Sequence, residues 1–113
     1  MNLKELVDRL DLKVYSGRKD LSRTISGGYA SDLLSDVIAH GRKSNLWVTL
    51  QIHPNIVAVA VLKELAAILL VNGREPSAET IEQAEKERIP ILGTPQSAFE
   101  CVGRLYGMGI KGH

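Results

Sequence analysis

The 113-residue chain is poor in cysteine and in aromatic residues, and both shortages argue against whole classes of protein. Cys101 is the single cysteine, so no internal disulfide can form, and the start Met1–Lys4 lacks the apolar core of a signal peptide. Both features predict a cytoplasmic protein. Aromatic residues make up 4% of the chain, and the net charge of +1 is spread without a basic stripe. Because nucleic-acid binding usually needs a basic face, often with aromatic platforms, no nucleic acid is expected as a partner.

Long hydrophobic runs and catalytic signatures are lacking as well. The apolar run Ile56–Leu62, which no other run exceeds in length, is far shorter than the roughly 20 residues of a membrane-spanning helix, so no membrane contact is predicted. The chain has no Gly-x-x-x-x-Gly-Lys-Ser/Thr phosphate loop, no Gly-x-Ser-x-Gly elbow and no His-Glu-x-x-His metal helix. We therefore expect a protein that is not an enzyme.

No metal and no cofactor are expected either. His40, His53 and His113 lie far apart in the sequence, and Cys101 falls on an apolar helical face, where a cysteine usually packs as a small hydrophobic residue. A catalytic cysteine would need an accessible, electropositive setting.

The chain has the size and the composition of one globular domain. Hydrophobic residues are 44% and charged residues 24%, close to the globular average. We predict a single domain over residues 1–113, with an N-terminal helix at 1–11 that Asn2 caps and a flexible tail at 110–113.

Strands and helices are expected to alternate along most of the chain. The predicted strands are 13–15, 22–25, 46–52, 67–71 and 89–92, and the predicted helices are 32–40, 54–66, 77–88 and one that begins at Thr94-Pro95. The last helix is expected to bury Ala98, Phe99, Val102, Leu105 and Tyr106. This alternation predicts an α/β fold: a mainly parallel sheet of four to five strands with helices packed on it.

The run Ile56–Leu62 is rich in β-branched residues, yet a helix there completes the alternation and follows Pro54. Such a helix would be apolar almost all round. It is then either well buried at the centre of the domain or packed against a second subunit, so a homodimer is expected as one of two equal alternatives.

The loops after the strands hold most of the polar residues with useful chemistry. Ligands of open parallel sheets bind beyond the carboxyl ends of the strands, where helix N-termini converge. The candidate ligand-binding residues are therefore Gly27, Gly28, Ser31, Asp32, Gln51, His53, Asn55, Asn72, Gly73, Arg74 and Thr94. Arg74 offers a fixed charge for phosphate or carboxylate. Each of these residues has a plainer alternative as a turn glycine, a helix cap or a solvated charge, and paired glycines more often mark a turn that binds nothing.

Four segments together resemble the DRTGG domain family, which is similar to the N-terminal domain of HPr kinase/phosphorylase. They are 27–32, 51–60, 69–73 and 91–95. The loops that give the family its name read Gly-Asp-Arg and Thr-Gly-Gly, whereas this chain has Gln51-Ile52-His53 and Asn72-Gly73-Arg74, so the backbone plan is shared more than the ligand chemistry. The resemblance implies an α/β regulatory or interaction module, often dimeric and without established activity, and some similar proteins are linked to hydrogenase and redox systems.

Three functional hypotheses follow. The first is a homodimeric binding module for a small anionic metabolite or nucleotide, or for a partner protein. The second is an accessory component of a phosphotransferase or redox enzyme system, or a transferase that uses His53 as acid or base. The third is a purely structural dimerisation unit.

Overall fold

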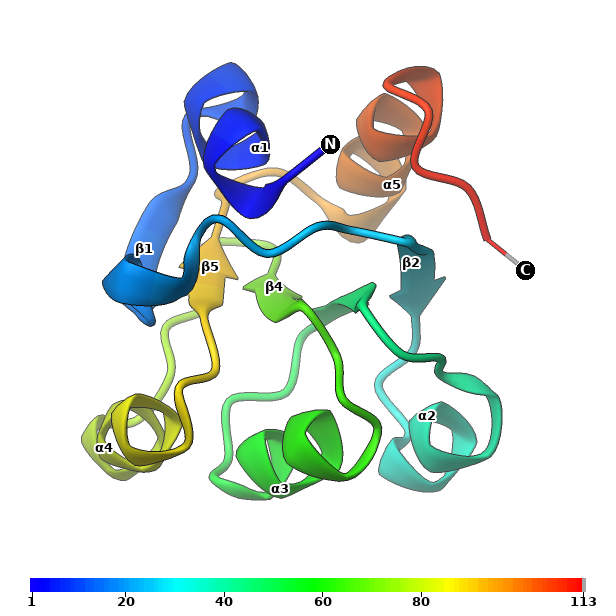
Figure 1. Cartoon of the computed structure of the whole chain (residues 1–113). Helices are drawn as coiled ribbons and strands as arrows, with labels where there is room; N and C mark the ends of the chain where they lie inside the picture. Colours follow the sequence, from blue (N-terminus) through cyan, green and yellow to red (C-terminus); the bar gives the residue numbers. More distant parts are fainter. Residues whose placement is uncertain (113) are drawn as a thin grey trace.

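Five strands form one sheet in the computed structural model, which describes residues 1–112 (Figure 1). The strands are β1 (Lys13–Ser16), β2 (Gly27–Ala30), β3 (Asn45–Thr49), β4 (Ala67–Leu70) and β5 (Ile91–Gly93), in the spatial order β1-β5-β4-β3-β2. Only β1 runs antiparallel to its neighbour. The predicted α/β class with a mainly parallel sheet is confirmed.

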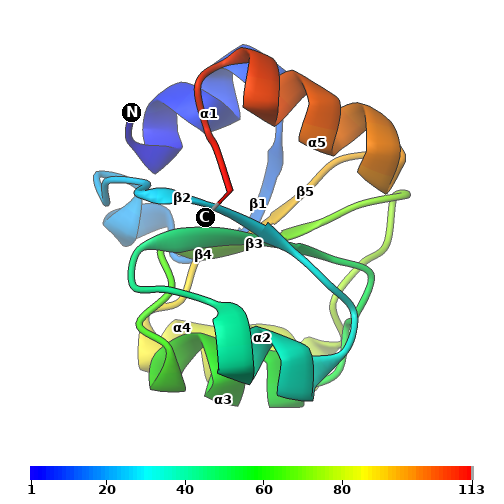
Figure 2. The same ribbon diagram turned by 90° about the vertical axis from the view of Figure 1, so that its right-hand side faces the viewer.

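Helices cover both faces of the sheet (Figure 2). They are α1 (Leu3–Leu10), α2 (Leu34–His40), α3 (Asn55–Leu62), α4 (Ala78–Glu87) and α5 (Ala98–Gly107), with a short 3-10 helix η1 (Arg18–Asp20) after β1. Helices α2, α3 and α4 lie side by side on one face, and α1 and α5 lie on the other. Two apolar cores result, one between each helical layer and the sheet.

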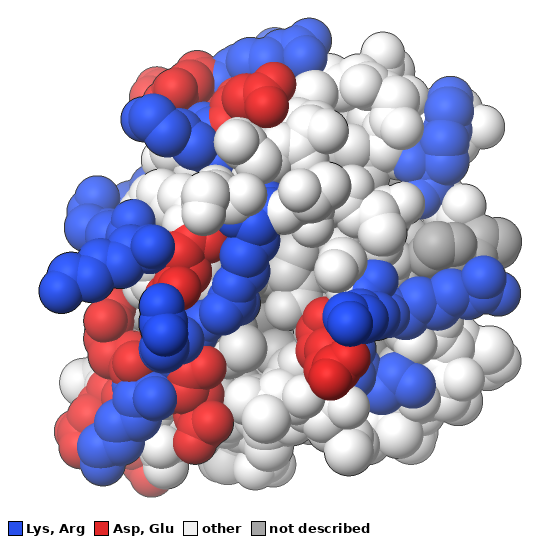
Figure 3. All heavy atoms as spheres, viewed as in Figure 1, with Lys and Arg blue, Asp and Glu red and all other residues white. Residues whose placement is uncertain are grey.

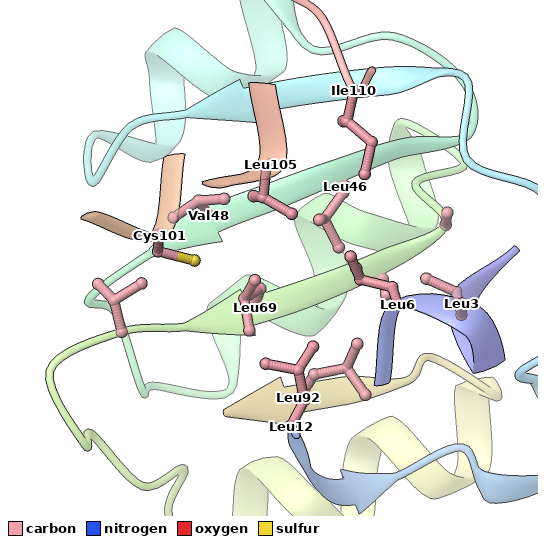
Figure 4. Close-up of a cluster of buried hydrophobic side chains, with 13 residues drawn as sticks. Leu3, Leu6, Leu12, Leu46, Val48, Leu69, Leu92, Cys101, Leu105 and Ile110 are labelled. Atoms are coloured by element: carbon pink, nitrogen blue, oxygen red, sulfur yellow. The ribbon is translucent and has the colours of Figure 1, made fainter. Parts of the chain in front are cut away.

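The core under α1 and α5 is built mainly from leucines (Figure 4). Leu69 at the centre of β4 is fully buried there, and Leu46 and Leu92 point into the same core from the strands on either side. Every residue of β4 is buried because the strand has a neighbour on each side and a helical layer on each face. Trp47, the only tryptophan, is fully buried in the opposite core.

Two helices begin at side-chain caps, and the one at Asn2 confirms the prediction. The Asn2 side chain accepts from the backbone N–H of Glu5 and the Glu5 side chain bonds back to Asn2, a reciprocal capping box. Ser77 caps α4 by accepting from the backbone N–H of Thr80. On the same helix, Glu82 and Lys86 pair at i, i+4 spacing, with 3.5 Å between their charged atoms.

One strand near the N-terminus was predicted at the wrong residues. Residues 22–25, predicted as a strand, lie outside the sheet, because their backbone groups bond to the start of the chain: Arg23 accepts from the N–H of Leu3, and Ile25 donates to Met1. The predicted loop at Gly27 is instead strand β2, parallel to β3. Gly28 lies close to the segment after α5, since a Cβ built on it would be 3.4 Å from the side chain of Ile110.

The run Ile56–Leu62 is helical, as predicted, and lies within α3. Helices α2 and α4 flank it on either side, and the sheet covers a third side (Figure 1). Of the two alternatives for an apolar helix, burial at the centre of a layer therefore explains most of its composition. The ends of its outer face, Val61 and Leu62, remain 42% and 64% exposed.

The last helix differs from the prediction in both its start and its buried face. Ser97, rather than Thr94, provides the cap, and Pro95 lies before the helix. Cys101 and Leu105 face the core, whereas Phe99 is 88% and Tyr106 57% exposed. Ala98 and Val102 are exposed as well. The helix is apolar on two sides, and only one of them can face the sheet.

The segment after α5 lies against the edge strand β2. Ile110 is buried, and the carbonyl of Lys111 accepts from the N–H of Gly28 at 2.9 Å. The predicted flexible tail thus includes residues that pack on the sheet, and His113 lies outside the described residues.

Candidate functional site

The carboxyl ends of β2 to β5 meet at one edge of the sheet, as the parallel pairing requires. Nine of the eleven predicted site residues follow a strand at this edge: Ser31, Asp32, Gln51, His53, Asn55, Asn72, Gly73, Arg74 and Thr94. Gly27 and Gly28 do not, because they form the start of β2 and so lie at its opposite end. The two glycines cannot take part in a site at the carboxyl edge.

Asp32 links the loop after β2 to the loop after β3 through hydrogen bonds. Its carboxylate accepts from the Thr49 hydroxyl at 2.9 Å and from the Leu50 N–H at 2.7 Å. The Gln51 side chain donates to the Asp32 carbonyl at 3.0 Å. Asp32 is therefore not the cap of α2, as one sequence alternative had it: the residue before that helix is Leu33, which makes no side-chain cap. Its hydrogen bonds give Asp32 a structural role in joining β2 to β3.

The pair Asn72-Gly73 forms a tight turn after β4. Both residues have positive φ, 57° and 66°, and the N–H of Arg74 donates to Val71 across the turn. Asn and Gly are the residues that adopt this conformation at least cost. Their own N–H groups donate to Gln96 and Thr94 of the next loop. The turn is thereby fixed to the end of β5, and these two N–H groups are not free to cradle an anion.

His53 provides the polar contact at the start of α3. Its Nδ1 accepts from the N–H of Asn55 at 3.2 Å, so Nδ1 carries no proton in this arrangement. The neighbouring carbonyl of Ile52 accepts from the Thr80 hydroxyl at 2.7 Å, which fixes the β3–α3 loop against the start of α4. Neighbouring strands and this hydrogen bond hold the loops after β3 and β4 next to each other.

Side chains, rather than backbone groups, are what this edge presents to solvent. His53, Asn55 and Arg74 are exposed, and Arg74 makes no ion pair within residues 1–112. A hollow of about 500 Å³ runs between α3 and α4; Asn55, Gln83 and the carboxylate of Glu87 contribute polar groups to its lining, which includes neither His53 nor Arg74. An anion can be bound by the Arg74 guanidinium, the His53 imidazole and the Asn55 amide. Within residues 1–112, no cluster of metal-ligating side chains occurs.

A second polar cluster was missed by sequence reasoning. The Tyr29 hydroxyl donates to Asp36 at 2.7 Å, and His40 Nδ1 lies 3.1 Å from the other carboxylate oxygen, with the Tyr29 and His40 rings stacked. The hydrogen bond from Tyr29 lowers the pKa of Asp36 below its usual value, and the same bond raises that of Tyr29. The i, i+4 spacing of Asp36 and His40 was the available signal, but Tyr29 lies on a segment predicted as a loop.

Two further features bear on chemistry. Cys101 is fully buried and burial raises its pKa to about 11, so the thiol is protonated at neutral pH. The letters Gly-x-Gly-x-x-Gly occur at residues 107–112, which sequence analysis overlooked, but they follow helix α5 instead of joining a strand to a helix. A dinucleotide fingerprint needs the strand–turn–helix setting, so these glycines do not form one.

Comparison with known proteins decides the family. The model of the DRTGG domain matches residues 5–108. The chain belongs to the DRTGG domain family. No curated protein matches it. Among solved structures, it is similar to the CBS and DRTGG domains of the regulatory region of Clostridium perfringens pyrophosphatase, in complex with the activator diadenosine tetraphosphate.

That likeness establishes the fold of this DRTGG domain. The TM-score is 0.74 at 17% sequence identity, and the match covers 97% of this chain. The chain spans only 47% of the pyrophosphatase chain. No helix within residues 1–112 is long and apolar enough to cross a membrane.

Proposed function

We propose that this DRTGG domain is a regulatory module without catalytic activity that binds a small anionic ligand, a nucleotide or a phosphorylated metabolite, and works as a homodimer in the cytoplasm. Support comes from the family and from the similar pyrophosphatase region, which is regulatory and was solved with a nucleotide activator. Since the chain covers about half of that region, the activator there is a guide to ligand class and not to the position of a site.

The side chains after β3 and β4 are the proposed contacts. Arg74 offers an unpaired positive charge, and Asn55 and His53 offer polar side chains at the start of α3, where the helix dipole favours negative charge. The observation that carries this assignment is the lateral hydrogen bonding of the edge: Thr80 holds the β3 loop, and Thr94 and Gln96 hold the β4 turn. Side chains on such a fixed framework lose little further freedom when they bind.

A thermal-shift series tests the proposal. Diadenosine tetraphosphate, ATP, AMP, phosphorylated sugars and inorganic phosphate are each titrated into the protein. A ligand that binds only the folded state raises Tm, by an amount that grows with concentration. Arg74→Ala is expected to weaken the response at least tenfold in ligand concentration, because it removes the charge that faces the anion.

Arg9→Ala is the matched control. Arg9 is an exposed arginine in the last turn of α1, on the opposite side of the sheet from α3 and α4. Its removal changes the net charge equally and should leave the response intact. An absence of any shift across the panel would contradict ligand binding, and an equal loss in both variants would show a general charge effect and contradict the assigned site.

A further inference from the structure

An apolar surface on α5 is left without cover by the chain itself. It consists of Ala98, Phe99, Val102, Gly103 and Tyr106, which lie along one side of the helix and line a shallow depression. Phe99 is 88% exposed, more than any other large hydrophobic residue described, and none of the five residues is charged, although the Lys111 ammonium lies 3.6 Å from the centroid of the Tyr106 ring. Elsewhere, as Figure 3 shows for one face, basic and acidic side chains lie interleaved around α1, η1 and α4. A clustered apolar surface of this kind usually marks a contact site.

Next to this surface lies a small hollow between α5 and the edge strand. Its volume is about 120 Å³, and it is lined by Gly28, Tyr29, Ala30, Val48, Val102, Leu105, Tyr106, Ile110 and Gly112. The lining is mainly apolar, and Val102 and Tyr106 belong to both the hollow and the exposed surface. A cavity of roughly 150 Å³ is known to accept a benzene ring, so an open hollow of this size suits one aromatic side chain.

We infer that a second copy of this chain covers the α5 surface, and that Phe99 of each copy enters the hollow between α5 and β2 of the other. The inference rests on the homodimer of the proposed function and names its interface. A projecting ring and a matching hollow on the same face of one molecule are what an isologous twofold contact requires. The five residues themselves carry no charge, and the Lys111 ammonium at the margin of the contact is held against the Tyr106 ring.

Helix geometry fits this arrangement. Two α5 helices that cross antiparallel with the twofold axis near Val102 and Gly103 place Phe99 of one copy opposite Tyr106 of the other. The two residues are seven positions apart, about 10 Å along the axis and on the same side of the helix. Gly103 lies at the crossing point, and a Cβ there would meet no atom within 4 Å, so the backbones can approach closely.

The area available shows that the strand edge must take part. Complete burial of an aromatic side chain removes about 150–250 Å² from water, so Phe99 and Tyr106 together offer on the order of 300 Å². A stable contact needs roughly 800 Å² from each partner. The α5 helix alone is too small, and the adjoining β2 edge with the segment 110–112 supplies the continuous surface that the shared hollow already joins to it.

Sedimentation equilibrium between about 1 and 200 µM tests the interface. The wild-type protein is expected to have the mass of a dimer in the upper part of that range. Phe99→Glu and Gly103→Glu should each raise the dissociation constant at least 100-fold and give monomers. Gly103→Glu replaces a helix glycine by a better helix former in open space, so its monomer should remain folded, as circular dichroism would verify.

Leu62→Glu is the matched control, because Leu62 is a 64% exposed apolar residue on α3 and should leave the mass unchanged. A monomeric wild-type protein would overturn the inference, and so would a dimer that survives both α5 substitutions or is lost through Leu62→Glu. The thermal-shift titration repeated on the Gly103→Glu monomer separates the two proposals. A ligand response in a monomeric wild-type protein would defeat the interface alone, and a dimer without any ligand response would defeat the binding site alone.

Discussion

Asp36 on α2 is a carboxylate that the folded structure stabilises in its ionised form. Its pKa is lowered in the folded protein, chiefly by the hydrogen bond from Tyr29. The bond therefore stabilises the fold at pH values above the usual carboxylate pKa. That contribution is lost as the pH falls through the lowered pKa of Asp36. Urea unfolding between pH 7 and pH 2 should show Asp36→Asn losing less stability with acid than the wild type, because the variant has no carboxylate to protonate.

Asp8→Asn serves as the comparison for this series, since Asp8 is an exposed carboxylate of α1 whose contact with Lys4 is long, at 3.8 Å. Parallel stability curves for wild type and Asp36→Asn would show that the Tyr29 bond does not act on stability. At alkaline pH the dependence runs the other way, because the pKa of Tyr29 is raised in the folded protein. The contribution of its hydrogen bond to the free energy of unfolding is complete below about pH 10 and is lost as the pH rises and the hydroxyl ionises.

Residue roles that depend on nearby sequence were predictable, and those that depend on distant contacts were not. Asn2 was recognisable as a cap because its partner lies three residues away, although the equally local cap of α5 was assigned to Thr94 instead of Ser97. Asp32 was selected as a ligand contact, but its partners Thr49 and Leu50 lie 17 and 18 residues along the chain and become visible only in the folded protein.

At the scale of elements, the cap of α4 gives a measurable prediction. Ser77→Ala removes the acceptor for the Thr80 N–H and should lower the free energy of unfolding by about 1 kcal/mol. Ser35→Ala is the control: Ser35 is exposed inside the first turn of α2, so stability should stay the same or rise slightly, since alanine favours helix. Chemical denaturation of both variants measures the difference, and equal midpoints would show that the cap contributes nothing.

Alternation of strands and helices made most elements predictable, and ambiguity arose where periodicity was weak. The segment Gly27–Ala30 has two glycines and no alternating pattern, so its strand structure comes from pairing with β3. In α5, two apolar stripes compete. The sequence favoured the one with Phe99 and Tyr106, but Cys101 and Leu105 fill the narrow space over the sheet.

For the whole molecule, the order of the strands in the sheet determines which regions are most stable against local unfolding. Strand β4 is central and fully buried, while β2 is at the edge and, within residues 1–112, its backbone bonds outward only to the segment after α5. The loops at the carboxyl edge differ in the same way. The Asn72-Gly73 turn follows the central strand β4, whereas Ser31 and Asp32 follow the edge strand β2. A ligand held at the β3 and β4 loops would therefore contact the more stable half of the edge.

Hydrogen exchange measured by mass spectrometry tests this gradient. Amides of residues 65–71 should exchange only through global unfolding, because the strand is paired on both sides and buried under both helical layers. Amides of residues 27–34 should exchange at least tenfold faster, since local opening of β2 breaks pairing with one strand only. Measurement on the Gly103→Glu variant removes any protection that a second copy would add at the β2 edge. Equal protection of both segments in that variant would mean that the sheet opens as one unit, contrary to the gradient.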